Sequence, residues 1–190
     1  MTPADFYGTE RGRAFFDAVC AVCPFEKTAS VLLLGFADPY RVRWDVVACP
    51  TENCTEFLPH RALSFSNVLV VHALEYVPDP DLLIKEISRV LVPNGIVVTV
   101  TPRRQNDFLP FQSLFSASEI ATGLKARDLT IRKQKTVLFD TFRDRLPCAA
   151  GGRFVITVAQ KDSLSSVPVG KTYPTPRAMT KASMASLPRR

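Results

Sequence analysis

The sequence has no long apolar run: no stretch approaches the ~20 consecutive apolar residues that a membrane-spanning helix needs. Its N-terminus carries acidic residues and no continuous apolar segment, so we expect neither a secretory signal nor a transit peptide. Without an export signal, the five cysteines point to a reducing compartment rather than to a disulfide framework. These absences predict an intracellular protein, in the cytoplasm or an organellar matrix, that has no membrane contact.

Two familiar catalytic signatures are also missing. The chain has neither the Ser-His-Asp order of a hydrolase nor a G-x-x-x-x-G-K loop that would cradle phosphates. Its apolar share is nonetheless 46%, which is enough for a buried core, and 190 residues suit one domain of ordinary size.

The net charge of +6 is concentrated at the C-terminal end. Residues 161–190 hold six basic residues and one acid, a charge of +5, which leaves +1 for residues 1–160. The C-terminal segment is rich in Pro, Ser, Thr and Lys and has no helical or strand period. We therefore predict a folded domain over residues 1–160 and a basic arm over residues 161–190 that contacts a protein or RNA partner. The alternative is an unstructured, solubilising terminus.

Apolar patterning predicts strands that alternate with helices. Helices are expected over residues 5–23, 79–91 and 116–124, and strands over residues 30–36, 43–48, 68–71, 96–100, 129–139 and 154–160. Asp79 is suited to cap the second helix, and Ser116 with Glu119 forms a capping box for the third. Because the strands in the middle of the chain are wholly apolar, we predict an α/β fold, a mostly parallel sheet with helices on both faces.

A set of motifs between residues 65 and 102 follows a recognisable order. An apolar strand ends at His72, a V-P-D-P turn leads into a helix, and a P-N-G turn leads into a further strand and a P-R-R segment. As a set, these motifs resemble the central part of a class I S-adenosylmethionine-dependent methyltransferase of the type 11 kind. The segments SVLLLGFADPY, SASEI and LFDTFRDRL support the resemblance, which runs from about Asp5 to Lys161. It implies a Rossmann-like sheet and S-adenosylmethionine as methyl donor.

The loop that would hold the donor departs from the family's pattern. The family commonly has D/E-x-G-x-G-x-G after the first strand, where glycines let the backbone approach the ligand closely. Here Leu33 replaces the acid, and Ala37 and Pro39 replace the second and third glycines. The cofactor-binding residues that the resemblance implies are Gly35, Ala37, Asp38, His72 and Ala73.

The chain is also short between the first and fourth strands of the family. Only 32 positions separate Gly35 from Asn67, which is room for one strand and barely for a second. The acid that would hold the ribose should end the second strand, yet no carboxylate occurs there before Glu52. The acid expected at the adenine aligns with about Cys54. Whether a third strand forms between residues 56 and 66 stays open.

These losses predict that S-adenosylmethionine binding is weak or lost. A hydrogen bond to a charged acceptor contributes ~1.5–3 kcal/mol. Two missing carboxylates therefore weaken a micromolar ligand by several orders of magnitude, at ~1.4 kcal/mol per tenfold. Two hypotheses follow: a non-catalytic subunit of a larger assembly, with a ribonucleoprotein as one candidate, and an active methyltransferase of unknown acceptor.

Three further groups of residues have alternative interpretations. Cys20 and Cys23, with Cys49 and Cys54, have a loose zinc-site spacing, but buried free thiols are the default and no metal is predicted. His72 is interpreted as a half-buried polar cap rather than a base, and Glu75 is assigned to the turn and the helix cap with Asp79. No catalytic residue is assigned.

A basic face that binds nucleic acid is the last candidate, and it rests on basic and aromatic side chains near one another in sequence. The alternative is that the aromatic side chains anchor a loop into the core while the charges lie in solvent. The residues are Arg103, Arg104, Lys125, Arg127, Arg132, Lys133 and Lys135, with Phe108, Phe111 and Phe115.

Overall fold

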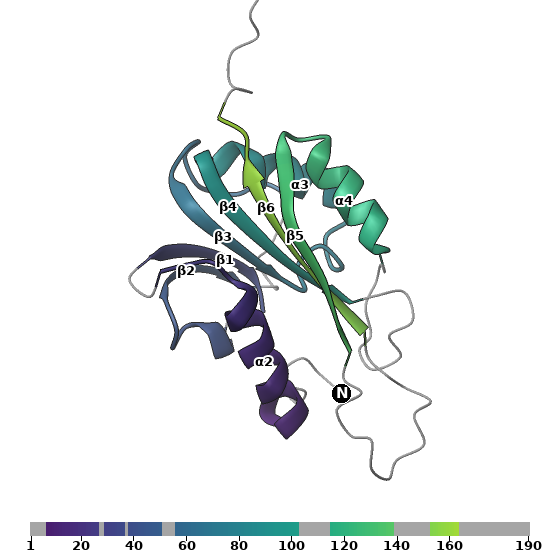
Figure 1. Cartoon of the computed structure of the whole chain (residues 1–190). Helices are drawn as coiled ribbons and strands as arrows, with labels where there is room; N and C mark the ends of the chain where they lie inside the picture. Colours follow the sequence, from purple (N-terminus) through teal and green to yellow (C-terminus); the bar gives the residue numbers. More distant parts are fainter. Residues whose placement is uncertain are drawn as a thin grey trace, which may run out of the picture.

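The computed structural model describes six ranges of the chain: residues 7–26, 29–36, 38–50, 56–102, 115–138 and 153–163 (Figure 1). The predicted arm lies outside the described residues from position 164 onward, as do Phe108 and Phe111. Within the described ranges, every helix is too short or too polar to span a membrane.

The strands form one six-stranded sheet in the order β2-β1-β3-β4-β6-β5. The strands are β1 (Ser30–Gly35), β2 (Asp45–Pro50), β3 (Phe65–Val71), β4 (Leu91–Pro102), β5 (Leu129–Leu138) and β6 (Arg153–Lys161). Strands β2, β1, β3 and β4 pair in parallel, and β6 is antiparallel to both β4 and β5. The predicted α/β fold with a mostly parallel sheet is confirmed.

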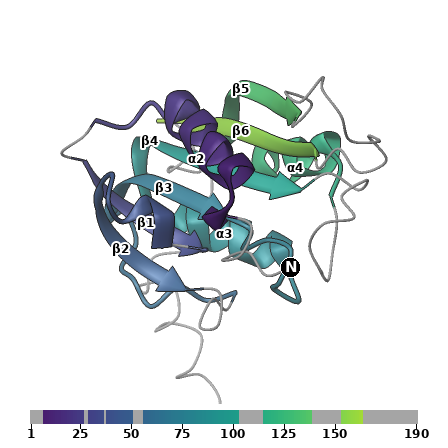
Figure 2. The ribbon, with the colours of Figure 1, turned by 90° about the horizontal axis from the view of Figure 1, so that it is seen from below.

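Three helices cover the two faces of this sheet. They are α2 (Glu10–Val22), α3 (Pro80–Val90) and α4 (Ala117–Lys125). Helix α2 packs on one face, where Phe15 and Val19 meet Leu33, and α3 and α4 pack on the other, where Ile87 and Leu124 belong to a second buried cluster (Figure 2). Since side chains alternate along each strand, the apolar runs supply both cores.

The caps explain where the helices begin. Thr9 accepts a hydrogen bond from the backbone N–H of Gly12, at 3.1 Å, so α2 begins later than the predicted residue 5. Asp79 caps α3 as predicted, and the capping box of Ser116 and Glu119 begins α4.

Strand β4 begins five residues earlier than predicted. Leu91 pairs with Phe65 and Ile96 pairs with Asn67, and the predicted turn residues lie in the irregular stretch between these pairs. Asn94 has a φ of 63°, the left-handed conformation that asparagine tolerates. The turn therefore exists, but it is built into the strand as an irregularity.

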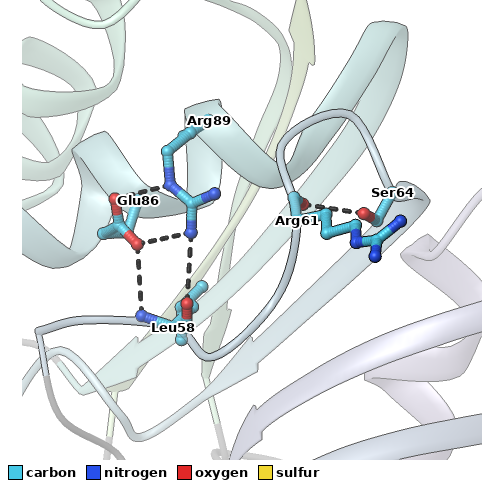
Figure 3. A network of polar contacts seen from close by, with 5 residues as sticks. All are labelled: Leu58, Arg61, Ser64, Glu86 and Arg89. Carbon is cyan, nitrogen blue, oxygen red and sulfur yellow. Dashed lines mark hydrogen bonds and ion pairs between the residues drawn. The ribbon is translucent and has the colours of Figure 1, made fainter.

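Turns and bends occupy residues 56–64, the place where a third strand was left open. This segment is fixed to α3 instead (Figure 3). The backbone N–H of Leu58 donates to Glu86 Oε2 at 3.2 Å, and Arg89 Nη2 donates to the carbonyl of Leu58 at 3.1 Å. Arg89 and Glu86 also form an ion pair at 2.7 Å. Ser64 Oγ donates to the carbonyl of Arg61 at 2.7 Å and closes the turn.

Candidate functional site

The carboxyl ends of β1 and β3 lie side by side, with Gly35 paired to Val71. Gly35 has a φ of +94°, and a Cβ at this position would lie 2.1 Å from the carbonyl oxygen of Val71. The next residue, Phe36, donates its backbone N–H to the same oxygen at 2.9 Å. The close packing of β1 against β3 is therefore sufficient to require glycine here, without any contribution from a ligand.

His72 follows β3 directly and is 1% exposed, so the prediction of a half-buried cap was wrong. Its backbone N–H donates to the carbonyl of Val100 at 3.1 Å, and its φ is 53°. Its Nε2 lies 3.4 Å from the hydroxyl of Tyr7, which lies 3.2 Å from the hydroxyl of Tyr40. Burial lowers the pKa of His72 to about 3, so this imidazole is neutral at physiological pH.

Aromatic rings from four separate parts of the chain surround this histidine. Tyr7 stacks on Phe36 with ring centroids 4.9 Å apart, and the His72 ring lies 6.4 Å from Phe15 and 5.4 Å from Phe154. Burial raises the pKa of Tyr7 and of Tyr40 well above the ordinary value, so both hydroxyls stay protonated. We call these side chains the ring cluster: Tyr7, Phe15, Phe36, Tyr40, His72 and Phe154.

Glu75 lies in the turn after β3 and is fully buried, at 0% exposure. Neither of its carboxylate oxygens has a hydrogen-bond partner among the described residues. Burial raises the pKa of Glu75 to about 8, and the proximity of its own backbone opposes this rise only partly. The sequence assigned Glu75 and Asp79 to the turn and the helix cap, and the structure has Glu75 in the turn and Asp79 at the cap of α3.

The structure describes two of the three other predicted cofactor residues. Ala73 is fully buried beside Gly35. Asp38 begins the short 3-10 helix η1 (Asp38–Tyr40), which carries Tyr40 into the ring cluster. Ala37 lies outside the described residues.

Sequence reasoning missed Tyr7 and Tyr40, and it named Glu75 without foreseeing its burial. No sequence pattern identifies Tyr7 and Tyr40, because the contact between their hydroxyls depends on how α2 and η1 pack on the sheet. Glu75 has such a pattern: an acid closely follows a wholly apolar strand, at the sheet edge where ligands bind in open α/β folds.

The described cysteines are free thiols. Burial raises the pKa of Cys20 to about 11 and the pKa of Cys23 further, so neither is a reactive thiolate at neutral pH. Within the ranges that the structure describes, no three potential metal ligands converge. Cys54 and the side chain of Cys49 lie outside those ranges.

The predicted basic face is present only in part. Lys125, the last residue of α4, and Arg127 just after the helix are exposed. The side chains of Arg132, Lys133 and Lys135 are exposed on β5, which is an edge strand. Arg103 and Arg104 lie outside the described residues. Phe115 packs against the core beneath α4, which favours the interpretation of the aromatic side chains as anchors.

The match to a known family spans this edge of the sheet. A family model described as a methyltransferase domain matches residues 36–99, from the end of β1 into β4. The strand order and the antiparallel β6 agree with the fold that the resemblance implied. Over this segment the chain resembles a methyltransferase domain. The resemblance stated from the sequence is thereby confirmed, and several solved structures with this fold are described as S-adenosylmethionine-dependent methyltransferases.

Solved structures of this methyltransferase fold match most of the chain. A chain of the complex between the Trm112 methyltransferase activator and a methyltransferase of Haloferax volcanii is 15% identical, with a TM-score of 0.65 over 84% of this chain and 93% of that one. A protein from Bacillus halodurans described as a methyltransferase is 14% identical, with a TM-score of 0.58 over 82% and 100%. The [4+2]-cyclase SpnF is 17% identical, with a TM-score of 0.57 over 78% and 80%. Comparison with curated protein sequences finds no match.

Proposed function

We propose that this methyltransferase relative has a degenerate donor site and acts as a non-catalytic component of a larger assembly. The observation that carries the proposal is the ring cluster at the carboxyl edge of β1 and β3. Ligands of open α/β sheets bind at this edge. Here Phe36 stacks on Tyr7 across the edge, and His72 is buried beneath Tyr7, Phe15 and Phe154.

The described residues fit S-adenosylmethionine poorly. Leu33, at the position of the family's acid, is fully buried in the sheet. Gly35 is explained by the contact of β1 with β3, and β2 ends at Pro50 rather than at a carboxylate. Residues 56–64 are turns fixed to α3, where the family has room for a further strand. We infer that donor binding is weak or lost.

A protein partner is the favoured reason for keeping such a fold. One fold neighbour is part of a complex with a methyltransferase activator, and another is a cyclase, so the fold serves more than methyl transfer. In this chain, residues 161–190 carry a charge of +5 and would suit an acidic surface on the partner.

Isothermal titration of the full chain with S-adenosylmethionine and S-adenosylhomocysteine tests the loss of donor binding. We expect dissociation constants about 100-fold or more above the micromolar range, from the missing charged hydrogen bonds. A low-micromolar dissociation constant for either compound would contradict the degenerate site.

Co-purification of partners with the full chain from native extract tests the assembly, with a chain ending at residue 163 as the comparison. We expect the full chain to retain a stoichiometric partner that the shorter chain does not retain.

An active methyltransferase is the second candidate, and Glu75 is the observation that favours it. A carboxyl with a pKa of about 8 exchanges its proton near neutral pH, as a group that accepts a proton from a methyl acceptor must. Methyl transfer otherwise needs mainly the alignment of the acceptor with the donor. Formation of S-adenosylhomocysteine in native extract that depends on the chain, and that Glu75→Gln abolishes, would establish this candidate over the first.

A further inference from the structure

A basic pocket lies where α3 ends and α4 turns into β5, with a volume of about 290 Å³. Strand β4 begins directly after α3, so the pocket lies at the amino end of the parallel strands, opposite the edge that carries the ring cluster. Four of the lining side chains are basic and one is acidic, which suits the pocket to an anion. The charged and polar residues that line it are Lys85, Ser88, Arg89, Arg127, Asp128 and Lys161.

Lys161 lines this pocket although it is only 9% exposed. Its Nζ donates to the carbonyl oxygen of Ser88 at 2.6 Å and to that of Leu91 at 2.9 Å, so it caps the end of α3. An ammonium group has three N–H donors. Among the described residues only two of them are used, so the third is available to a ligand, at a position that the two bonds to α3 fix.

Two exposed cations lie beside Lys161. The side chains of Lys85 and Arg127 form no hydrogen bond or ion pair within the residues that the structure describes, whereas Arg89 is paired with Glu86. The backbone of Arg127 is nevertheless held in place, because its carbonyl accepts a hydrogen bond from Ser88 Oγ at 3.0 Å. The pocket thus has two uncommitted positive charges on a fixed backbone.

The ends of the helices explain only part of this charge. Helices α3 and α4 both end at the pocket, and the C-terminal end of a helix carries about half of one negative charge. These two ends, together with Asp128 and Glu86, offset about three of the four positive charges. About one positive charge is left, which matches the single negative charge of one phosphodiester group.

Exposed basic side chains continue from the pocket along an edge of the sheet. Arg132, Lys133 and Lys135 are exposed on β5, which begins two residues after Arg127 and is an edge strand. At ~3.3 Å per residue, these side chains extend the positive charge about 20 Å from the pocket. A track of this shape suits an extended polyanion better than a single anionic group.

An exposed aromatic ring lies on the other side of the pocket. Arg89, which lines the pocket, donates from Nη2 to the carbonyl of Leu58 at 3.1 Å (Figure 3). The residue before Leu58 is Phe57, which is 66% exposed. Exposed rings beside basic side chains stack on the bases of single-stranded nucleic acids. This ring therefore favours a nucleic acid over an acidic protein surface, which offers carboxylates but no bases.

We propose that the basic pocket binds a phosphate group of a single-stranded RNA whose backbone continues along β5. Lys161 and Arg127 would donate to the phosphate oxygens, and Lys85 would add positive charge at the rim. The inference assigns a ligand to the folded domain, beyond the protein assembly proposed above. It holds whether or not the donor site is degenerate, because the pocket lies at the other end of the strands.

Fluorescence anisotropy of the full chain with a labelled oligouridylate, measured at several salt concentrations, tests the inference. We expect micromolar binding at low salt that weakens as salt rises, because bound cations are released from the phosphates. Arg127→Ala and Lys85→Ala should each weaken binding about 10-fold at low salt. Each should also reduce the slope of log affinity against log salt by about 0.7, the value for one phosphate contact on a single strand.

These two substitutions leave the fold intact, since both side chains are exposed and the Arg127 carbonyl that Ser88 binds remains. Lys161 is kept, because its substitution would also remove the cap of α3. The matched control is Arg43→Ala, which removes one exposed positive charge beside β2, at the opposite edge of the sheet. It should change the affinity less than about 2-fold, since a distant exposed charge is screened by salt.

Phe57→Ala distinguishes RNA from an acidic protein. It should weaken binding of the oligouridylate about 5-fold or more through loss of stacking, and it should leave binding of polyglutamate unchanged. An unchanged affinity of Phe57→Ala for the oligouridylate would overturn the assignment to RNA, as would polyglutamate that binds as tightly as the oligouridylate.

The inference is also overturned if the full chain does not bind the oligouridylate at micromolar concentration in low salt. It fails equally if Arg43→Ala weakens binding as much as Arg127→Ala, because the effect would then reflect net charge alone. None of these results changes the titration with S-adenosylmethionine, so a failure here leaves the proposed function standing. Low-micromolar binding of S-adenosylmethionine would in turn leave the RNA site standing.

Discussion

Replacing Glu75 with glutamine should change how stability depends on pH, and the structure gives the size of the change. Burial raises the pKa of Glu75 from 4.5 to about 8 and lowers the pKa of His72 from 6.5 to about 3. Between pH 4.5 and 6.5 the unfolded chain holds a proton on His72 and the folded chain holds one on Glu75, so the two effects cancel. From pH 6.5 to 8 only the folded chain holds the extra proton, and stability falls by about 1.4 kcal/mol per pH unit.

The wild type should therefore lose about 2 kcal/mol of unfolding free energy between pH 6.5 and 8, and Glu75→Gln should lose almost none. The sign follows from the direction of the shift: a carboxyl whose folded pKa is raised favours folding below its unfolded pKa, and this contribution is lost as pH rises. The described tyrosines and cysteines remain protonated in both states over this interval, so they add little.

Urea unfolding at pH 5.5, 6.5 and 8 measures this effect, with the fluorescence of the single tryptophan, Trp44, as the signal. Trp44 is buried beside Phe25 in the face covered by α2, so its emission reports loss of that core. Asp81→Asn, which changes an exposed carboxylate in the first turn of α3, should keep the wild-type fall. If Glu75→Gln loses as much stability as the wild type between pH 6.5 and 8, Glu75 is not the group that holds the proton, and the argument from its burial fails.

Three other substitutions test the packing around the site. Gly35→Ala should cost about 2 kcal/mol or more of unfolding free energy in urea, because of its left-handed φ and the clash with Val71. Gly123→Ala should cost little, because its Cβ would meet the ends of the Ile84 and Asp81 side chains, and equal costs would refute the account of Gly35. Arg89→Ala should speed hydrogen exchange at the amide of Leu58 and leave the amide of Leu69 protected, and unchanged exchange at Leu58 would show that the polar network does not hold residues 56–64. Asp79→Ala should lower the unfolding free energy by about 1 kcal/mol through loss of the α3 cap. An unfolding free energy equal to that of the wild type would contradict the role of this cap.

The fold could be predicted from the sequence because its signals are local. The apolar runs of β1 and β3 identify buried parallel strands, and the caps at Asp79 and Ser116 fix where two helices begin. The shortened region after β1 also follows from counting residues. These signals need no knowledge of which segments meet in space.

The environment of the candidate site could not be predicted in the same way. His72 is buried because Tyr7, Phe15 and Phe154, far apart in the chain, converge on it. The burial of Glu75 has the same origin, and it turns an ordinary turn residue into a protonated carboxyl. Periodicity identifies the strand end but carries no information about the side chains that cover it.

Two features of the carboxyl edge bear on function in opposite directions. The ring cluster lies at the edge of the sheet where ligands of open α/β folds bind, and its rings pack on one another, which favours a protein that has lost its methyl donor. Glu75 brings a desolvation cost that a scaffold could avoid with an apolar residue, which favours a ligand at the same place. The substitution Glu75→Leu separates the two: a scaffold gains stability and loses nothing, whereas a protein that uses Glu75 to bind a ligand gains stability and loses that binding.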